Sequence, residues 1–466
     1  MQLGDVLTDE TLDVQTASVE VDRVEIDSRR CVYPTLFFAL PGSNADGVDF
    51  VRDAVARGAV AVVSPRAITS PGPVVVIAAS RIHRVLAQAG AAVSEHPEAG
   101  IELVGVTGTN GKTTVTSLVA NLARSLGWNG ALIGTLTNER TTPAAPELYR
   151  SLARLRSDFD PSRPASVVAL EVSSHALDQQ RVVGCRFAVV AFTNLSHDHL
   201  DYHHTMESYF AAKARLFSLE YSSRAVIWVD DPYGARLAAS TALAVTAVSR
   251  RDASDVVSSL SGTAFFWRGH LVNTALVGDY NIDNALVAMS IVVELGARED
   301  EVAAAMAGVA GVPGRFEVVH QGEFTVIVDY AHTPQGLERL LGSVRELCTG
   351  RVLSVFGCGG DRDASKRPAM GAVASQMSDL TVVTSDNPRH ESPDAIIDAI
   401  IAGVVGPADV RREVDRRVAI ARALEEARPG DVVVVAGKGH ETTQTFADRV
   451  EDFDDREVVR ELLKGS

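Results

Sequence analysis

The chain has 466 residues, of which 46% are hydrophobic and 22% are charged, a composition typical of a globular enzyme with about three domains. Its formal net charge of −16 argues against nucleic acid as the main partner, because phosphate backbones bind basic surfaces. No apolar run approaches the ~18–20 residues of a membrane-spanning helix, and residues 1–5 lack the layout of a signal peptide. We therefore expect a cytoplasmic protein, a monomer without membrane or nucleic-acid partners.

The four cysteines are scattered and form no C-x-x-C pair. This spacing fits neither a zinc knuckle nor a disulfide framework, so we expect reduced and mostly buried thiols. They are Cys31, Cys185, Cys348 and Cys358.

The first predicted domain covers residues 1–98. Its apolar runs at 36–39, 60–63 and 74–77 are typical of strands, and residues 51–57 and 81–95 favour helices. Pro97 and Gly100 indicate a boundary after it.

The second predicted domain covers residues 99–312 and has an α/β pattern. Its expected strands lie at 101–106, 167–172, 187–192, 225–229 and 242–248, and its expected helices at 115–126, 206–218, 282–295 and 299–307. The glycines and proline of residues 311–314 predict a linker to the third domain.

The third predicted domain, 313–466, alternates strands at 325–328, 352–356, 380–384 and 432–436 with helices at 335–347, 366–377, 393–404 and 417–426. This alternation predicts a doubly wound, mostly parallel sheet of the Rossmann-like kind. Ligands of such a sheet lie where the strands end, which here means Asp329, Gly357, Asp386 and Gly437.

The most informative segment is Thr-Gly-Thr-Asn-Gly-Lys-Thr-Thr at 107–114, between a predicted strand and a predicted helix. Backbone N–H groups of such a turn hold phosphate oxygens, a lysine reaches the terminal phosphates, and a following threonine binds Mg²⁺. We expect it to bind ATP through its central residues, which are Gly108, Thr109, Asn110, Gly111, Lys112, Thr113 and Thr114.

Three further positions are candidates for phosphoryl-transfer chemistry. Glu171 ends a predicted strand, where a carboxylate can hold Mg²⁺ directly or through water. His199 lies in a His/Asp-rich loop that, taken alone, is more often a polar turn than a metal site. Lys213, taken alone, is an ordinary helical lysine.

Ten ordered motifs resolve these ambiguities through a resemblance. Together with the phosphate loop, they make the whole chain similar to the Mur ligase superfamily, and within it to the MurE type. The motifs are T-T-P at 141–143, E-V-S-S-H at 171–175, T-N-L-S-H-D-H-L-D at 193–201, the helix of Lys213, G-D-Y-N-I-D-N at 278–284, G-R-F-E at 314–317, D-Y-A-H-T-P at 329–334, G-C-G-G-D-R-D at 357–363, S-D-N-P-R at 385–389 and A-G-K-G-H-E at 436–441.

The resemblance implies a three-domain ligase in peptidoglycan precursor synthesis. In this family ATP activates the D-glutamate carboxylate of UDP-MurNAc-L-Ala-D-Glu as an acyl phosphate, and an amino acid then attacks it. The lysine matching Lys213 is carbamylated by CO₂, and its carbamate helps to bind a second Mg²⁺ together with the histidine matching His199. The implied metal-binding set is Thr113, Glu171, His199 and Lys213.

The same resemblance implies contacts to the two nucleotides. Asn281 and Asn284 match adenine contacts, Arg315 a nucleotide contact and Asp329 a ribose contact. The implied contacts of the UDP-MurNAc-dipeptide are Ser28, Asn44, Ala45, Thr141, Thr142, Ser173, Gln179 and Arg181. Val48 stands where many relatives carry a histidine.

The incoming amino acid is expected to be meso-diaminopimelate. It differs from L-lysine by a distal carboxylate, which a guanidinium fork recognises well. D-N-P-R is the form associated with diaminopimelate addition, and Glu441 is suited to accept the distal ammonium. The expected pocket is formed by Arg362, Asp386, Asn387, Arg389, Gly437 and Glu441.

Four alternatives remain open from the sequence. The chain is also consistent with addition of L-lysine, or with a folylpolyglutamate synthase or another Mur ligase. The first domain argues against a folylpolyglutamate synthase, and S-D-N-P-R argues against both. A non-catalytic Mur-like subunit would carry a four-cysteine zinc insert, which these cysteines do not match. A nucleotide-dependent switch protein would need no amino-acid clamp such as Arg389 and Glu441.

Overall fold

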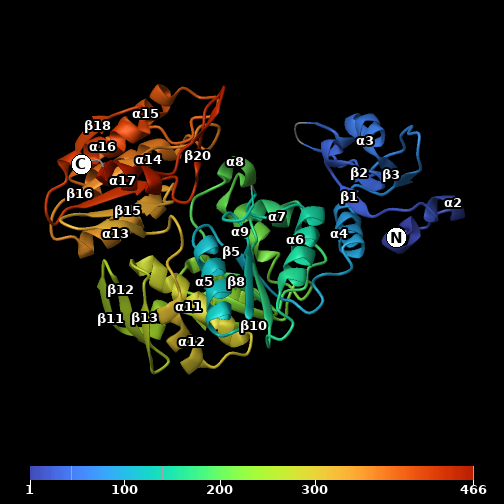
Figure 1. The fold of residues 1–466 in the computed structure, drawn as a ribbon, viewed down its shortest axis with the longest axis horizontal. Helices are drawn as coiled ribbons and strands as arrows, with labels where there is room; N and C mark the ends of the chain where they lie inside the picture. The colour runs from blue at the N-terminus through green and yellow to red at the C-terminus, as the bar shows by residue number, and fades with distance from the viewer. Residues whose placement is uncertain (43–44, 139, 465–466) are drawn as a thin grey trace.

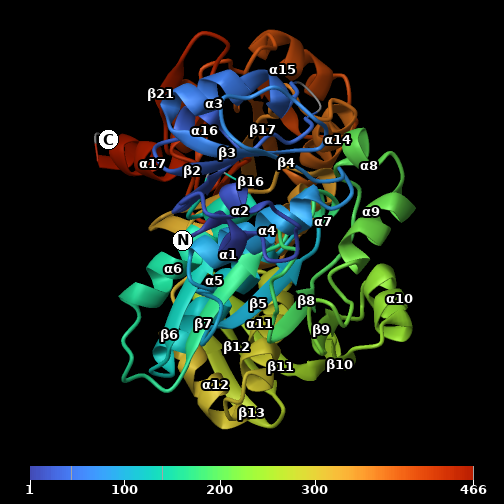
Figure 2. The same ribbon diagram turned by 90° about the vertical axis from the view of Figure 1, so that its right-hand side faces the viewer.

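The computed structural model describes residues 1–42, 45–138 and 140–464. Three α/β parts follow one another along the chain (Figure 1). Figures 1 and 2 show the first and last parts on the same side of the middle one, to either side of the short helix α8 (Leu200–His203). The strand ends of the middle sheet therefore face both outer parts.

The N-terminal part is built on a four-stranded parallel sheet in the order β1-β2-β3-β4. The three predicted strands and both predicted helices are present, whereas β1, α1 and α2 are too short to give a periodic signal. The elements are α1 (Leu3–Val6), α2 (Val14–Ala17), β1 (Arg23–Glu25), β2 (Thr35–Phe38), α3 (Val51–Arg57), β3 (Ala59–Ser64), β4 (Val74–Val76) and α4 (Ile82–Val93), with 3-10 turns η1 (Ser28–Arg30) and η2 (Gly47–Phe50).

The middle part has a six-stranded parallel sheet in the order β10-β9-β8-β5-β7-β6. Its central strands are buried on both faces, which explains their continuous apolar runs. The strands are β5 (Glu102–Thr107), β6 (Asn129–Ile133), β7 (Ser166–Glu171), β8 (Val189–Phe192), β9 (Arg224–Trp228) and β10 (Ala244–Val248). The helices are α5 (Lys112–Ser125), α6 (Ala145–Asp158), α7 (Ser174–Asp178), α8, α9 (Met206–Ala214), α10 (Pro232–Ser240), α11 (Asp279–Glu294) and α12 (Glu299–Ala305).

A three-stranded antiparallel sheet follows, formed by β11 (Ala253–Ser259), β12 (Gly262–Trp267) and β13 (His270–Thr274). No predicted element corresponds to it, because its short strands are rich in serine, threonine and other polar residues. Phe265, Trp267 and Val272 point to the core beside α11 and bury one face of this sheet.

The C-terminal part is a six-stranded sheet in the order β14-β15-β19-β16-β17-β18, parallel except for the edge strand β14. Helices α13, α14 and α15 pack on one face and α16 and α17 on the other, as predicted for a doubly wound sheet. The strands are β14 (Glu317–Gln321), β15 (Thr325–Asp329), β16 (Val352–Phe356), β17 (Leu380–Val383), β18 (Asp409–Arg412) and β19 (Val432–Ala436), followed by a β20 (Thr443–Thr445) and β21 (Val450–Asp452) hairpin. The helices are α13 (Pro334–Leu347), α14 (Lys366–Met377), α15 (Pro393–Ile401), α16 (Arg416–Glu426) and α17 (Asp455–Lys464).

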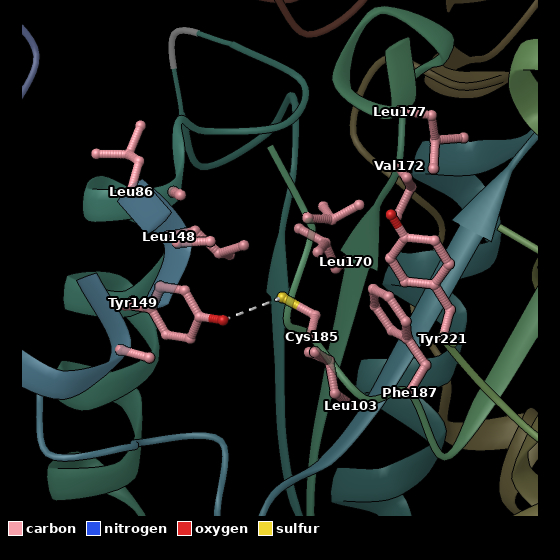
Figure 3. Packing of buried hydrophobic residues seen from close by; sticks show 14 of the residues in the cluster. Leu86, Leu103, Leu148, Tyr149, Leu170, Val172, Leu177, Cys185, Phe187 and Tyr221 are labelled. Atoms are coloured by element: carbon pink, nitrogen blue, oxygen red, sulfur yellow. Dashed lines mark hydrogen bonds between the residues drawn. The ribbon is translucent and has the colours of Figure 1, made fainter. Parts of the chain in front are cut away.

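One hydrophobic cluster continues from the N-terminal part into the middle sheet. Leu86 of α4 belongs to the same buried cluster as Leu148 and Tyr149 of α6 and Leu170 of β7 (Figure 3). An ion pair between Arg150 and the buried Glu25, at 2.9 Å, reinforces this junction. The first two parts are therefore fixed to one another by a shared core, and the predicted boundary near residue 98 stays a prediction.

The four cysteines are free, and three of them are buried, as predicted. Cys185 donates to the Tyr149 hydroxyl across 3.9 Å within the cluster of Figure 3. Within the described ranges, no helix has the length and apolar character needed to cross a bilayer.

Candidate active site

The predicted phosphate loop lies between β5 and α5, and the helix begins at Lys112. Gly108 (φ 153°) and Gly111 (φ 86°) have backbone angles that favour glycine, and a Cβ at Gly108 would lie 1.9 Å from Thr193 Oγ1. The Lys112 ammonium folds over the loop and donates to the carbonyl oxygens of Gly108 and Thr109, at 2.8 Å each. A glycine-built turn with a lysine and a helix N-terminus is suited to phosphate.

Glu171 comes to this loop from the end of β7, which is hydrogen-bonded to β5. Thr113 Oγ1 donates to Glu171 Oε2 at 3.0 Å, and both side chains are buried. The backbone N–H of Thr135 donates to the other carboxylate oxygen at 2.8 Å. Two of the predicted metal-binding residues thus meet, and their oxygen atoms suit Mg²⁺, which completes its shell with phosphate oxygens and water.

Lys213 is buried in α9, with 1% of its surface exposed. Its ammonium donates to Gly108 O at 2.7 Å and lies 4.7 Å from the centre of the Tyr209 ring. Burial and the nearby Lys112 charge lower its pKa well below the usual range, although Asp198 acts in the opposite direction. Lys213, which in the sequence alone is an ordinary helical lysine, is therefore part of the phosphate-loop site.

His199 lies in the loop between β8 and α8, and its Nε2 is 3.5 Å from Asp198 Oδ2. Its ring is 5.0 Å from that of His175 and 6.1 Å from that of Tyr209, which lies under Lys213. Partial burial lowers its pKa, so the imidazole is neutral at neutral pH and able to bind a metal. Across the described residues, no three His, Cys, Asp or Glu side chains gather as a metal site.

A cavity opens beside the phosphate loop, between the middle and C-terminal parts. It brings together six predicted nucleotide contacts, namely Asn110, Gly111, Thr114, Asn284, Arg315 and Asp329. Asn281 does not line it, because its amide donates to Val277 O at 2.8 Å and faces a second cavity. Asn284 Nδ2 donates to Asn281 Oδ1 across 3.4 Å, so the two amides are linked by a hydrogen bond.

Arg315 and Asp329 close this cavity from the C-terminal side. The Arg315 guanidinium donates to Thr113 Oγ1 at 3.2 Å and stacks over the Tyr330 ring at 4.2 Å. The Asp329 carboxylate accepts from the backbone N–H of Phe316 at 2.6 Å and of Ala331 at 2.7 Å. These bonds fix the carboxylate at the tip of β15, where a ribose could meet it.

The residues expected to hold the muramoyl-peptide end form a connected group next to Glu171. Thr142 Oγ1 donates to Glu171 O at 2.8 Å and is 3.3 Å from Ser173 Oγ. Arg181 donates to Thr142 O at 2.9 Å and to the Gln179 side chain at 2.6 Å. Thr141 is partly buried beside them.

The expected uridine contacts belong to the N-terminal part. Ser28 is buried in η1 and Ala45 is exposed. Asn44 lies outside the described residues.

The predicted amine pocket lies at the tips of β17, β16 and β19, which are neighbours in the sheet. Asn387 Nδ2 donates to Glu441 Oε2 at 2.7 Å, so two predicted residues from distant motifs are in contact. A Cβ at Gly437 would lie 2.6 Å from Asp386 Oδ2. Arg389 donates to Gly360 O at 2.7 Å, and Arg362 is exposed on the same loop.

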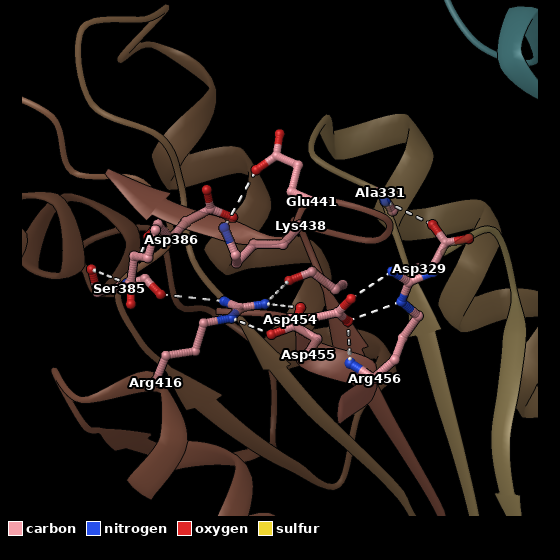
Figure 4. A network of polar contacts seen from close by, with 12 residues as sticks. Asp329, Ala331, Ser385, Asp386, Arg416, Lys438, Glu441, Asp454, Asp455 and Arg456 are labelled. Carbon is pink, nitrogen blue, oxygen red and sulfur yellow. Dashed lines mark hydrogen bonds and ion pairs between the residues drawn. The ribbon is translucent and has the colours of Figure 1, made fainter. Parts of the chain in front are cut away.

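Below this pocket lies a fully buried ion pair, shown in Figure 4. Arg416 binds Asp455 at 2.7 Å and also donates to the carbonyl oxygens of Ala436 and Ser385. It therefore ties the ends of β19 and β17 together, and with them the loops that carry Asp386 and Gly437.

Several cavity-lining residues were not selected from the sequence. Tyr280, Asp283 and His332 lie inside the motifs at 278–284 and 329–334, which could have indicated them as site residues. No motif includes Trp228 or Arg339. A strand-end tryptophan and a helical arginine become site residues only when the sheet and α13 are placed together.

Three family models match the chain. "Mur ligase family, catalytic domain" matches residues 20–102, "Mur ligase middle domain" residues 106–292 and "Mur ligase, glutamate ligase domain" residues 314–439.

Relatives with curated names match over nearly the whole chain. A UDP-N-acetylmuramoyl-L-alanyl-D-glutamate--2,6-diaminopimelate ligase of Gloeobacter violaceus is 44% identical, covering 99% of this chain and 98% of its own. A protein of the same name from Aquifex aeolicus is 40% identical, covering 97% and 96%. A solved structure with this ligase name has a TM-score of 0.69 at 30% identity, covering 100% and 99%. A Mycobacterium tuberculosis folylpolyglutamate synthase shares the fold, with a TM-score of 0.58 at 20% identity, over 75% of this chain and 91% of its own.

A phosphate loop and a separate acceptor pocket on three α/β parts define a nucleotide-dependent ligase. The family models and the near-full-length relatives settle which kind: the chain belongs to the Mur ligase family.

Proposed function

We propose that this Mur ligase joins meso-diaminopimelate to UDP-MurNAc-L-Ala-D-Glu at the expense of ATP, in cytoplasmic peptidoglycan precursor synthesis. The observation that carries the proposal is the contact between Asn387 and Glu441, beside Arg389, at the tips of β17 and β19 on either side of β16. This pocket offers the carboxylate of Glu441 and the guanidinium of Arg389 to one ligand. The names of the most similar relatives support the same substrate.

The reaction runs in two chemical stages. The γ-carboxylate of the D-glutamate attacks the γ-phosphate of ATP, which gives an acyl phosphate and ADP. The amine of diaminopimelate then attacks the acyl carbon, and inorganic phosphate leaves the tetrahedral intermediate. Lys112 and Arg315 lie where they neutralise charge that develops on the phosphoryl oxygens.

Mg²⁺ fits the oxygen donors at the phosphate loop. Thr113 and Glu171 would hold one ion together with phosphate oxygens, and His199 with a carbamylated Lys213 a second. Bound there, Mg²⁺ neutralises the charge of the transferred phosphoryl group. The carbamate fits because the buried Lys213 amine, whose pKa is strongly lowered, is neutral more readily and can then take up CO₂.

Arg389 and Glu441 divide the distal end of the amino acid between them. The Arg389 guanidinium is suited to the distal carboxylate and the Glu441 carboxylate to the distal ammonium. L-Lysine would satisfy Glu441 but leave the guanidinium without its anion, and an unmatched polar group of this kind disfavours binding strongly.

Phosphate release tests the proposal, measured with ATP, Mg²⁺ and UDP-MurNAc-L-Ala-D-Glu. We expect turnover with meso-diaminopimelate, little with L-lysine and none without an amino acid, and product masses identify what was joined. The Arg389→Ala variant should lose most of its turnover with diaminopimelate. Equal turnover with both amino acids would refute the amine assignment, and release that needs no amino acid would refute the ligase reaction.

A further inference from the structure

One buried cation at the amine pocket has no role in the chemistry described above. Lys438 follows β19 and has no exposed surface. Its ammonium donates to Thr443 O at 2.5 Å, Asn387 Oδ1 at 3.4 Å and Glu441 Oε2 at 3.4 Å. An ammonium has three donor hydrogens, so each of them has an acceptor here.

Two glycines fix the direction of this side chain. Gly437 has φ 115° and Gly439 has φ 54°, and Cβ atoms there would lie 2.6 Å from Asp386 Oδ2 and from Gly314 O. The turn therefore packs its backbone against both neighbouring loops and sends only the Lys438 side chain into the space below the pocket. Figure 4 shows that side chain between Asp386 and Glu441.

Asn387 is held in a single orientation by the same contacts. Its Oδ1 accepts from the Thr445 backbone N–H at 3.0 Å and from Lys438, while its Nδ2 donates to Glu441 Oε2. Both Asn387 and Lys438 thus bind one oxygen of the Glu441 carboxylate. The other oxygen, Oε1, has no hydrogen-bond partner in the described part of the chain and is left for a ligand.

The charge of Lys438 matters because two carboxylates share this small volume. Burial and the nearby Asp386 charge raise the pKa of Glu441, whereas Lys438 and Asn387 lower it. Tyr330, Arg416 and Cys358 are further ionisable groups that interact with the charge of Glu441 or Asp386. Lys438 is therefore the cation in direct contact with Glu441, and it offsets the repulsion from Asp386.

We propose that Lys438 is a positioning residue that holds Glu441 as a carboxylate aimed at the distal ammonium of the incoming amino acid. Lys438 does not touch the reacting atoms. It makes the pocket selective for an acceptor with a distal amine. This inference rests on the proposed function, since it concerns the same pocket.

The test is steady-state kinetics of Lys438→Met, which keeps the side-chain length and removes the charge. We expect the KM for diaminopimelate to rise about tenfold or more, with the KM values of ATP and UDP-MurNAc-L-Ala-D-Glu within about threefold of wild type. In a Glu441→Gln background the same change should add less than about threefold, because residues that act through one another are not additive. Ile397→Ala, a core truncation in α15, is the control for lost stability and should leave all three KM values unchanged.

Lys438→Gln is the second variant, because it keeps a donor for Thr443 O without the charge. An unchanged KM for diaminopimelate in either folded variant, or an equal rise of all three KM values, would overturn the inference. Full additivity with Glu441→Gln would do the same. If the wild-type enzyme does not use diaminopimelate, the proposed function is wrong, whatever the Lys438 variants show. The wild-type assay therefore distinguishes failure of the proposed function from failure of the Lys438 inference.

Discussion

At the scale of single residues, the role of Lys213 is the one that its local sequence indicates least, because it depends on burial beside the phosphate loop. A buried amine next to Lys112 is disfavoured as a cation, and we propose that it reacts with CO₂ and releases a proton. The product would be a carbamate that carries negative charge toward Gly108 and the phosphate loop.

We predict that the wild-type protein in ¹³C-labelled bicarbonate shows a carbamate carbon resonance that Lys213→Ala lacks. Lys464→Ala, at the end of the exposed face of α17, should keep the resonance. The turnover number of Lys213→Ala should fall on the order of 10²-fold or more, because charge stabilisation at the phosphoryl group is lost. A wild-type spectrum without the resonance, in protein that turns over, would contradict the carbamate.

Asp283 is a second residue with a defined expectation. It lines the nucleotide cavity, and burial raises its pKa from 3.8 to about 7, against the charges of Arg250 and Arg339. The folded protein therefore holds a proton between about pH 4 and 7 that the unfolded chain has lost. Its contribution to stability is present at low pH and is lost as the pH rises through this window.

We predict that Asp283→Asn gains stability relative to wild type as the pH rises from 4 to 7, by on the order of 1 kcal/mol or more. Thermal melts across this range without nucleotide provide the measurement. Asp279→Asn, which removes a more exposed carboxylate bound to the same Arg250, should show no such trend. Parallel stability curves for Asp283→Asn and wild type would contradict the assignment.

At the scale of elements, the segment that joins the middle and C-terminal parts contacts the amine-pocket loop, the phosphate loop and α17. Gly314 has φ 64°, and a Cβ there would lie 2.1 Å from His440 N, in the loop that carries Lys438 and Glu441. The next residue, Arg315, reaches Thr113 of the phosphate loop. Glu317 accepts from the Gly314 N–H at 2.8 Å and pairs with Arg460 of α17 at 3.2 Å.

We predict that Gly314→Ala raises the KM values of both ATP and diaminopimelate and lowers the melting temperature. Gly127→Ala is the matched control, because Gly127 has φ 78° but no atom within 4 Å of a Cβ. Both variants carry a backbone cost of about 1–3 kcal/mol, and only Gly314→Ala displaces the loop. Equal kinetics in the two variants would mean that the linker does not connect the sites.

The elements also indicate how much of the fold the sequence could predict. Continuous apolar runs predicted β16 and β19 with their observed bounds, because strands buried on both faces carry uninterrupted apolar residues. The bounds of α14 were also predicted as observed. The β11–β13 sheet, β14 and β18 were not predicted. Edge and surface strands bury few side chains, so their sequences show only a weak hydrophobic pattern.

The site divides in the same way. Contacts within one motif, such as Lys112 over the phosphate loop, follow from local sequence. The pairing of Asn387 with Glu441 and the approach of Arg315 to Thr113 depend on strand order and on the packing of two parts. Lys438 lies in the motif A-G-K-G-H-E, but the sequence does not predict its role, because that role depends on its burial and its hydrogen-bond partners.

At the scale of the whole molecule, the three parts are joined unequally. The N-terminal and middle parts share one large hydrophobic cluster, whereas the C-terminal part joins through residues 311–314, the contacts around Arg315 and the packing of Val277 and Tyr280 against its core. The amine pocket must approach the acyl phosphate, and we infer that the C-terminal part moves as a unit about this linker.

We predict that X-ray scattering records a smaller radius of gyration when a non-hydrolysable ATP analogue and UDP-MurNAc-L-Ala-D-Glu are bound. Lys112→Met, which loses a phosphate contact, should stay at the ligand-free dimension. The same envelope in all states of the wild-type protein would contradict closure.

The central claim is that this Mur ligase selects diaminopimelate, and a direct competition tests it. Wild-type protein receives ATP, Mg²⁺, UDP-MurNAc-L-Ala-D-Glu and equal concentrations of meso-diaminopimelate and L-lysine, and the masses of the products are counted. We expect the diaminopimelate product in large excess, on the order of 10⁴-fold, because lysine leaves a built polar group unmatched. Lysine product in comparable or greater amount would contradict the account.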